Sequence, residues 1–147
     1  MNTQPLRIGF IGAGANTRLR HIPGFLELES VELVAVCNRS HESGARVATE
    51  FGIPRIETDP EMILADETID AVCIGTWPYR HHDYSIRALQ AGKHVYVEKP
   101  MARDLGEARA MIDAAERASV QLMVGESYFF HSPHRLARKL VDDGTIG

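Results

Sequence analysis

Two glycines separated by one residue, Gly12 and Gly14, follow a short apolar run and precede a stretch predicted to be helical. This is the setting of a dinucleotide-binding turn, where one glycine makes a tight turn and the next lets the backbone approach a pyrophosphate. The N-terminus of the helix would offer free N–H groups and a favourable dipole to that anion. Thr17 stands where a third glycine is usual, and its hydroxyl is expected to contact a phosphate. The alternative is a structural turn without a ligand.

The residues Asn38, Arg39 and Ser40 follow the next long apolar run. An NAD-binding domain usually has Asp or Glu about 20 residues beyond the glycines, where the carboxylate binds the ribose hydroxyls. Asn38 would not repel a 2′-phosphate, Arg39 can pair with it, and Ser40 can add a hydrogen bond. This pattern predicts NADP. NAD remains the alternative if Asn38 binds a 2′-hydroxyl and Arg39 is a solvated surface residue.

Lys99 stands between another apolar run and Pro100. A lysine at the end of a buried strand would carry positive charge where an alkoxide develops during the oxidation of an alcohol. The competing interpretation is a solvated surface lysine. Because a lysine between a buried strand and a proline is badly placed to be incidental, we expect Lys99 to be catalytic.

Short apolar runs rich in Val and Ile predict strands that are buried on both faces of a parallel sheet. The runs cover residues 6–12, 31–37, 69–75, 93–99 and 120–125, with a weaker run at 54–58. Residues that favour a helix start lie between these runs, namely Asp59, Asp104 and Ser132. Glycines that favour a helix end are Gly52, Gly92 and Gly144. This alternation predicts a single α/β domain with a doubly wound, mostly parallel sheet of the Rossmann type.

Ligands of such open sheets bind outside the carboxyl ends of the strands. The residues at or just past these predicted ends are Gly12, Asn38, Thr76, Glu98 and Gly125. We therefore expect the chemistry-bearing residues to meet at this one edge of the sheet.

The chain has 147 residues, is 44% hydrophobic and carries a net charge of −4. This size suits one domain with one buried core. The lack of clustered Lys and Arg argues against a nucleic-acid partner, and no apolar stretch approaches the roughly 20 residues of a membrane span. No leader peptide is evident, and two isolated cysteines, Cys37 and Cys73, are expected to be buried free thiols. We therefore expect a cytoplasmic protein.

The sequence contains seven histidines. No pair of them has a metal-ligand spacing with a supporting third ligand, so we predict no metal site. Four are expected to be surface or structural residues, namely His21, His41, His94 and His134.

Two segments, GFIGAGA at 9–15 and GTWPYRHHDYSIRALQAGKHVYVEKPMA at 75–102, carry a family resemblance. The sequence resembles the N-terminal domain of the Gfo/Idh/MocA oxidoreductases, a family that includes glucose–fructose oxidoreductase and inositol dehydrogenase. The resemblance covers essentially the whole chain, 1–147, as a dinucleotide-binding domain. Its most specific part is the AGKHV…EKP segment.

The resemblance implies roles for individual positions. The family's cofactor turn matches residues 12–15. Its Thr-Pro-Asn loop matches residues 76–78, where Trp77 and Pro78 depart from the pattern, and Trp77 is expected to pack against the cofactor. The family histidine on the next helix matches His81. The cofactor-binding set is thus Gly12, Gly14, Ala15, Asn16, Thr17, Asn38, Arg39, Ser40, Thr76, Trp77, His81, Glu98 and Lys99.

The family's Glu-Lys-Pro motif matches residues 98–100. Family members place this lysine beside the nicotinamide ribose and the substrate hydroxyl, with a cis bond before the proline. The segment GESYFFHSP at 125–133 resembles one that leads to an Arg-Phe-x-Pro pattern, and Phe130 or His131 stands where Arg is common.

These expectations combine into one function. The chain is interpreted as the NADP-binding domain of an oxidoreductase that transfers hydride between a nicotinamide cofactor and a sugar or polyol carbinol. The resemblance implies a second domain, absent from this chain, so the isolated chain is expected to be inactive and the full-length enzyme to be a homo-oligomer. One alternative is a non-catalytic regulator that senses dinucleotide. Another is an S-adenosylmethionine methyltransferase, which is disfavoured because Asn38 is not acidic.

Overall fold

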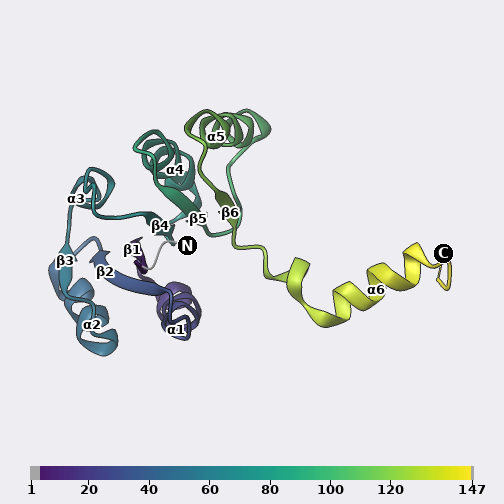
Figure 1. Ribbon diagram of the computed structural model, residues 1–147, viewed down its shortest axis with the longest axis horizontal. Coiled ribbons are helices and arrows are strands. Elements are labelled where there is room, and N and C mark those ends of the chain that lie inside the picture. The colour runs from purple at the N-terminus through teal and green to yellow at the C-terminus, as the bar shows by residue number, and fades with distance from the viewer. Residues whose placement is uncertain (1–3, 147) are drawn as a thin grey trace.

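In the computed structural model, which describes residues 4–146, one parallel sheet lies between two layers of helices (Figure 1). Within those residues six strands pair in the order β3-β2-β1-β4-β5-β6, and each neighbouring pair is parallel. The strands are β1 Leu6–Ile11, β2 Val31–Cys37, β3 Arg55–Glu57, β4 Ala71–Ile74, β5 His94–Val97 and β6 Leu122–Val124. The predicted doubly wound sheet of the Rossmann type is confirmed, and every predicted run contains a strand.

The helices cover both faces of this sheet. They are η1 Thr17–His21, α1 Ile22–Leu26, α2 His41–Phe51, α3 Glu61–Leu64, η2 Pro78–Arg80, α4 His81–Gln90, α5 Leu105–Ala118, η3 Ser127–Phe130 and α6 Ser132–Asp142. Helices α1 and α2 lie on one face, whereas α3, α4 and α5 lie on the other (Figure 1). Because connections between parallel strands cross over, successive strands bring a helix to one face or the other and bury both.

Each face of the sheet has its own core. On the α1 and α2 face, Phe10 and Ile22 are fully buried. On the opposite face, Leu89 of α4 and Met111 of α5 are fully buried in a second cluster. Strand β4 lies between the two and is buried at all of its positions. This apolar centre explains why the runs predicted as strands are nearly continuous in hydrophobicity.

The predicted helix ends are largely correct. Gly52, Gly92 and Gly144 all have positive φ angles, of 68°, 75° and 72°. Asp104 caps α5, since its Oδ1 accepts a hydrogen bond from the N–H of Glu107 at 2.9 Å. The prediction that Ser132 caps α6 is wrong. The helix begins at Ser132 itself, and the preceding residue, His131, makes no side-chain cap.

The segment after β6 leads away from the sheet into α6 (Figure 1). None of the residues of α6 is buried in the part of the chain that the structure describes. Apolar side chains on it, such as Leu136 and Val141, are more than half exposed. The two cores are therefore complete without this helix.

Candidate functional site

The ends of β1, β2, β4 and β5 meet at one side of the sheet, here named the carboxyl edge and made of residues 12–17, 38–40, 76–78 and 98–100. The register brings these ends together, because Ile11 pairs with both Cys37 and Ile74, and Ile74 pairs with Val97. The predicted meeting of these segments is confirmed.

Gly12 is required by the geometry of the turn after β1. Its φ of 87° lies in the left-handed region, where a side chain is strained. A Cβ there would also lie 2.7 Å from Thr76 Cγ2 and 2.8 Å from the Thr76 backbone nitrogen. Gly14 differs, since a Cβ on it would meet no atom within 4 Å. The surface over Gly14 is thus open, and the exposed residues Ala15 and Asn16 follow it.

Thr17 lies beneath this turn. It is 1% exposed, and its hydroxyl donates a hydrogen bond to the Gly12 carbonyl at 3.1 Å. A Cβ on Gly75 would lie 2.0 Å from the same hydroxyl, so the two segments are in close contact. The expected contact between Thr17 and a phosphate is therefore not supported, because the side chain is buried in the packing between the turn and β4.

Asn38 supports the glycine turn from the end of β2. Its Oδ1 accepts a hydrogen bond from the Ala13 N–H at 2.8 Å. Ser40 caps α2, with its hydroxyl oxygen accepting from the Ser43 N–H at 3.4 Å. Arg39 is exposed between them, and the structure gives its guanidinium no hydrogen bond or ion pair among residues 4–146. The free cation next to a helix N-terminus makes this corner attractive to an anion.

His81 lies under the loop after β4 instead of lining the site. It is 1% exposed, and its Nδ1 and Nε2 lie 2.7 Å and 2.9 Å from the carbonyl oxygens of Pro100 and Thr76. Both ring nitrogens therefore have backbone partners. The structure gives no support to the expectation that His81 binds cofactor, because its ring lies between two loops of the carboxyl edge and contacts the backbone of both. Trp77 projects outward and is 73% exposed.

Glu98 joins the end of β5 to the turn after β1. Its Oε1 lies 2.5 Å from Asn16 Nδ2 and 2.7 Å from His21 Nε2. Its Oε2 accepts a hydrogen bond from the Lys99 N–H at 2.9 Å. The side chains of Glu98 and His21 are only 12% and 13% exposed. His21 was expected to be a surface or structural residue, and its contact with Glu98 was not predicted.

No local pattern in the sequence pointed to His21. It lies between Thr17 and Ile22, and only the structure shows that both of these residues are fully buried. Its ring packs edge-on against Tyr96, with centroids 5.0 Å apart. Burial raises the pKa of Tyr96 to about 12, so the phenol keeps its proton at neutral pH.

Lys99 is exposed at the end of β5, and its bond to Pro100 is cis, as expected. Its backbone is held by Glu98, whereas the structure gives its ammonium group no hydrogen bond or ion pair within residues 4–146. The backbone of Lys99 is thus held in place, whereas its ammonium group is free to meet a ligand. Such a group can meet a ligand oxygen without first breaking a contact within the protein.

Phe130 and His131 lie on the segment that leads away to α6. The His131 Nδ1 lies 2.9 Å from the His134 Nδ1, so this pair belongs to the start of α6. The structure does not bring these two residues to the carboxyl edge.

Cys37 and Cys73 are buried free thiols. Burial raises the pKa of Cys37 to about 11 and also raises the pKa of Cys73, so neither is a reactive thiolate at neutral pH. In residues 4–146 no group of three or more His, Cys, Asp or Glu side chains could hold a metal ion. Among the same residues no helix is long and apolar enough to span a bilayer.

A glycine turn after β1, polar residues after β2 and a free lysine after β5 thus meet outside the carboxyl ends of a parallel sheet. This arrangement defines a nucleotide-binding domain of the Rossmann class. The model of an oxidoreductase family, GFO_IDH_MocA, described as having an NAD-binding Rossmann fold, matches residues 6–126. The chain belongs to this oxidoreductase family, as its sequence led us to expect.

Curated relatives match almost the whole chain. A 1,5-anhydro-D-fructose reductase from Ensifer adhaerens is 36% identical over 141 residues, which are 96% of this chain and 42% of the relative. A D-apiose dehydrogenase from Paraburkholderia graminis is 34% identical over 137 residues, which are 93% of this chain and 36% of the relative. The chain therefore spans less than half the length of these relatives.

Solved structures of the same family share the fold. KijD10, a 3-ketoreductase from Actinomadura kijaniata solved in complex with NADP and TDP-benzene, matches with a TM-score of 0.89 and 30% identity. The match covers 98% of this chain and 44% of that structure. An apo scyllo-inositol dehydrogenase from Lactobacillus casei also has a TM-score of 0.89, at 26% identity, and the match covers 100% of this chain and 44% of that one.

Proposed function

We propose that residues 1–147 form the NADP-binding domain of an oxidoreductase. The enzyme transfers hydride between the nicotinamide and a carbinol carbon of a sugar or polyol. Lys99 is the catalytic residue, since its ammonium group would meet the reacting oxygen. Relatives whose names are 1,5-anhydro-D-fructose reductase and D-apiose dehydrogenase support a sugar-like substrate.

The residues of the carboxyl edge fit a dinucleotide. Gly14 leaves open surface beside the start of η1, where a pyrophosphate can approach the backbone. Arg39 has no partner among residues 4–146 and lies beside the N-terminus of α2, so it can pair with a 2′-phosphate. Thr76 and Trp77 flank the region between the turn and Lys99, where the nicotinamide half would lie. This unpaired Arg39 favours NADP over NAD.

The bound nicotinamide would accept or supply the hydride. The protein supplies position and charge. In the direction of reduction, the carbonyl oxygen of the substrate gains negative charge as hydride adds to its carbon, and the positive ammonium group of Lys99 would stabilise that charge in the transition state. In the reverse direction the same group would stabilise the alkoxide from which hydride leaves. The single observation that carries the proposal is the free, backbone-anchored Lys99 on the same edge as the open glycine turn.

We further propose a cytoplasmic, homo-oligomeric enzyme without a nucleic-acid partner. Buried free thiols suit a reducing compartment, and a net charge of −4 disfavours nucleic acid. The exposed apolar side chains of α6 offer surface for assembly. Light scattering on the full-length protein would measure its oligomeric state.

The test is a titration of the chain with NADPH and with NADH, followed by the emission of Trp77, the single tryptophan of the sequence. A reduced nicotinamide absorbs where tryptophan emits, so binding should quench Trp77. NADPH should bind about tenfold more tightly than NADH, which corresponds to about 1.4 kcal/mol for the 2′-phosphate contact. Calorimetry measures the same constants without relying on Trp77.

The matched variants are Arg39→Ala and Arg109→Ala. Both arginines are exposed, but Arg109 lies on α5, at the other face of the sheet. Arg39→Ala should remove the preference for NADPH, whereas Arg109→Ala should keep it. Equal binding of NADH and NADPH by the unmodified chain would contradict the role of Arg39. Binding of NADPH by the full-length protein without turnover of any polyol would instead favour the dinucleotide-sensing regulator.

A further inference from the structure

The Glu98 carboxylate connects both halves of the carboxyl edge. Its Oε1 accepts from Asn16 at 2.5 Å, on the turn after β1, and its Oε2 accepts from the Lys99 backbone at 2.9 Å, after β5. The remaining contact of Oε1 is His21 Nε2 at 2.7 Å. One carboxylate thus contacts both the turn after β1 and the backbone of Lys99.

The hydrogen-bond partners of the His21 ring determine which of its nitrogens carries the proton. Glu98 Oε1 accepts, so the nitrogen that faces it, Nε2, must carry a proton and donate. Nδ1 lies 3.4 Å from the Tyr96 hydroxyl, which keeps its proton because burial raises the pKa of Tyr96 to about 12. Tyr96 can therefore donate to Nδ1 and hold the ring in the tautomer that donates to Glu98. The ring thus has a partner at each nitrogen, and the side chain is mostly buried.

The backbone conformation of η1 is an independent observation. The segment is a π-helix, in which the Ile22 N–H donates to the Thr17 carbonyl. Such turns are rare and occur frequently at functional sites, because they rotate side chains out of the regular helical register. Here Thr17 and Ile22 are fully buried at the two ends of the turn, and the turn brings His21 to Glu98.

We infer that His21 is a positioning residue. It fixes the Glu98 carboxylate, and through that carboxylate it couples the cofactor turn at Asn16 to the backbone of Lys99. The inference rests on the proposed function, because it gives the turn and Lys99 their cofactor and catalytic roles. It predicts that loss of the His21 donor disturbs both ends of the bridge while the fold remains intact.

The experiment compares His21→Leu, which removes the donor, with His21→Gln, whose amide can still donate to Glu98. Nuclear magnetic resonance reports the Lys99 amide proton in the cofactor-free chain, and calorimetry reports NADPH affinity. His21→Leu should move the Lys99 amide signal upfield and raise the NADPH dissociation constant about fivefold. His21→Gln should restore both. In a Glu98→Gln background the effect of His21→Leu should shrink, since coupled residues are not additive.

A packing control separates this role from structural support. Phe25 contacts Tyr96 edge-on at 6.0 Å but makes no hydrogen bond to the bridge. Phe25→Leu should lower the melting temperature without moving the Lys99 amide signal or the NADPH affinity. The inference is overturned if Phe25→Leu matches His21→Leu in both readouts, or if His21→Leu leaves either readout unchanged. Failure of the unmodified chain to bind NADPH would instead reject the proposed function, so the two failures are distinguishable.

Discussion

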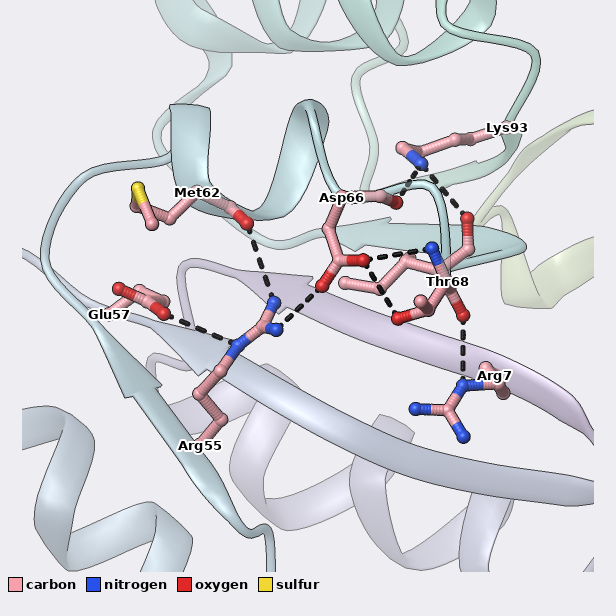
Figure 2. A network of polar contacts seen from close by, with 8 residues as sticks. Arg7, Arg55, Glu57, Met62, Asp66, Thr68 and Lys93 are labelled. Atoms are coloured by element: carbon pink, nitrogen blue, oxygen red, sulfur yellow. Dashed lines mark hydrogen bonds and ion pairs between the residues drawn. The ribbon is translucent and has the colours of Figure 1, made fainter.

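The strands of the sheet begin at one side, the amino edge, and end at the other, the carboxyl edge. These two sides carry similar side chains, but the side chains have different partners. At the amino edge, where β1, β3, β4 and β5 begin, charged side chains bind the protein itself (Figure 2). Arg55 donates to Asp66 at 2.6 Å, and the other oxygen of Asp66 accepts from the N–H and hydroxyl of Thr68. Lys93 is 3% exposed and donates to the carbonyls of Asp66 and Ile69.

At the carboxyl edge, the cations Arg39 and Lys99 have no such partners in residues 4–146. Both edges therefore contain lysine, arginine and carboxylates, and residue type alone does not distinguish a site from a structural network. The distinction lies in which polar groups the protein leaves unsatisfied. A network of paired polar groups stabilises the fold, whereas a free cation on an open surface is available to a ligand.

The largest effect on stability is expected at the glycine turn of the carboxyl edge. Gly12→Ala should lower the free energy of unfolding by about 3 kcal/mol, because a Cβ at positive φ would contact the Thr76 backbone. Urea denaturation measures this change. Gly24→Ala, on α1, is the matched control, since a Cβ there meets no atom within 4 Å.

Gly14→Ala tests the second glycine of the same turn. The open space there predicts a change in unfolding free energy below about 0.5 kcal/mol. NADPH affinity should nevertheless fall, because the added methyl group blocks the surface that the pyrophosphate approaches. Equal unfolding energies for Gly12→Ala and Gly14→Ala would refute the distinction between a glycine needed for the turn and one needed for a ligand.

Lys99→Ala should have the next largest effect. In the full-length enzyme, kcat should fall about 100-fold, since one stabilising group is lost from the transition state. The dissociation constant for NADPH should change far less, because the ammonium group is proposed to meet the substrate oxygen. Steady-state kinetics and calorimetry separate these two quantities. Unchanged kcat in Lys99→Ala would remove the lysine from the mechanism.

Asp66→Asn tests the amino edge and should change stability alone. Loss of the charge-assisted contact to Arg55 should lower the free energy of unfolding by about 1 to 2 kcal/mol. NADPH affinity should stay unchanged, because this network lies at the opposite edge. A reduced NADPH affinity with an intact fold would show that the two edges are coupled.

The network around Asp66 also predicts how the stability difference between the unmodified chain and Asp66→Asn depends on pH. The hydroxyl of Thr68, followed by its N–H and by Arg55, lowers the pKa of Asp66 from 3.8 to about 2. The ionised form therefore stabilises the fold fully above the unfolded-state pKa, and this contribution is lost as pH falls from about 4 through about 2. The stability difference between the unmodified chain and Asp66→Asn should thus narrow over that range.

The strands and the glycine turn could be predicted because they depend on local patterns. Continuous apolar runs with Val and Ile suit strands covered on both faces, and Gly12 is the residue type that a left-handed turn needs. Even the weak run that became β3 was found, since three residues suffice for an edge strand. The family model and the solved structures confirm the fold that these patterns predicted.

Side-chain roles were harder to predict because packing decides them. Thr17 and His81 have polar atoms that could reach a ligand, yet each is 1% exposed and bonded to backbone carbonyls. No spacing rule reveals which carbonyl a buried hydroxyl or imidazole will find. His21 was missed for the converse reason, since its contact with Glu98 joins residues 77 positions apart through a π-turn.

The hydrogen bond from Ala13 to Asn38 has a consequence for changing cofactor choice by design. With its oxygen accepting from the Ala13 N–H, Asn38 still has both amide hydrogens to donate to a ligand, and these suit a ribose hydroxyl and a phosphate alike. Position 38 thus fits both NADP and NAD, and the choice between the two cofactors depends on the neighbouring Arg39. A redesign toward NAD should therefore replace Arg39 first and keep Asn38, because altering Asn38 would loosen the glycine turn that both cofactors need.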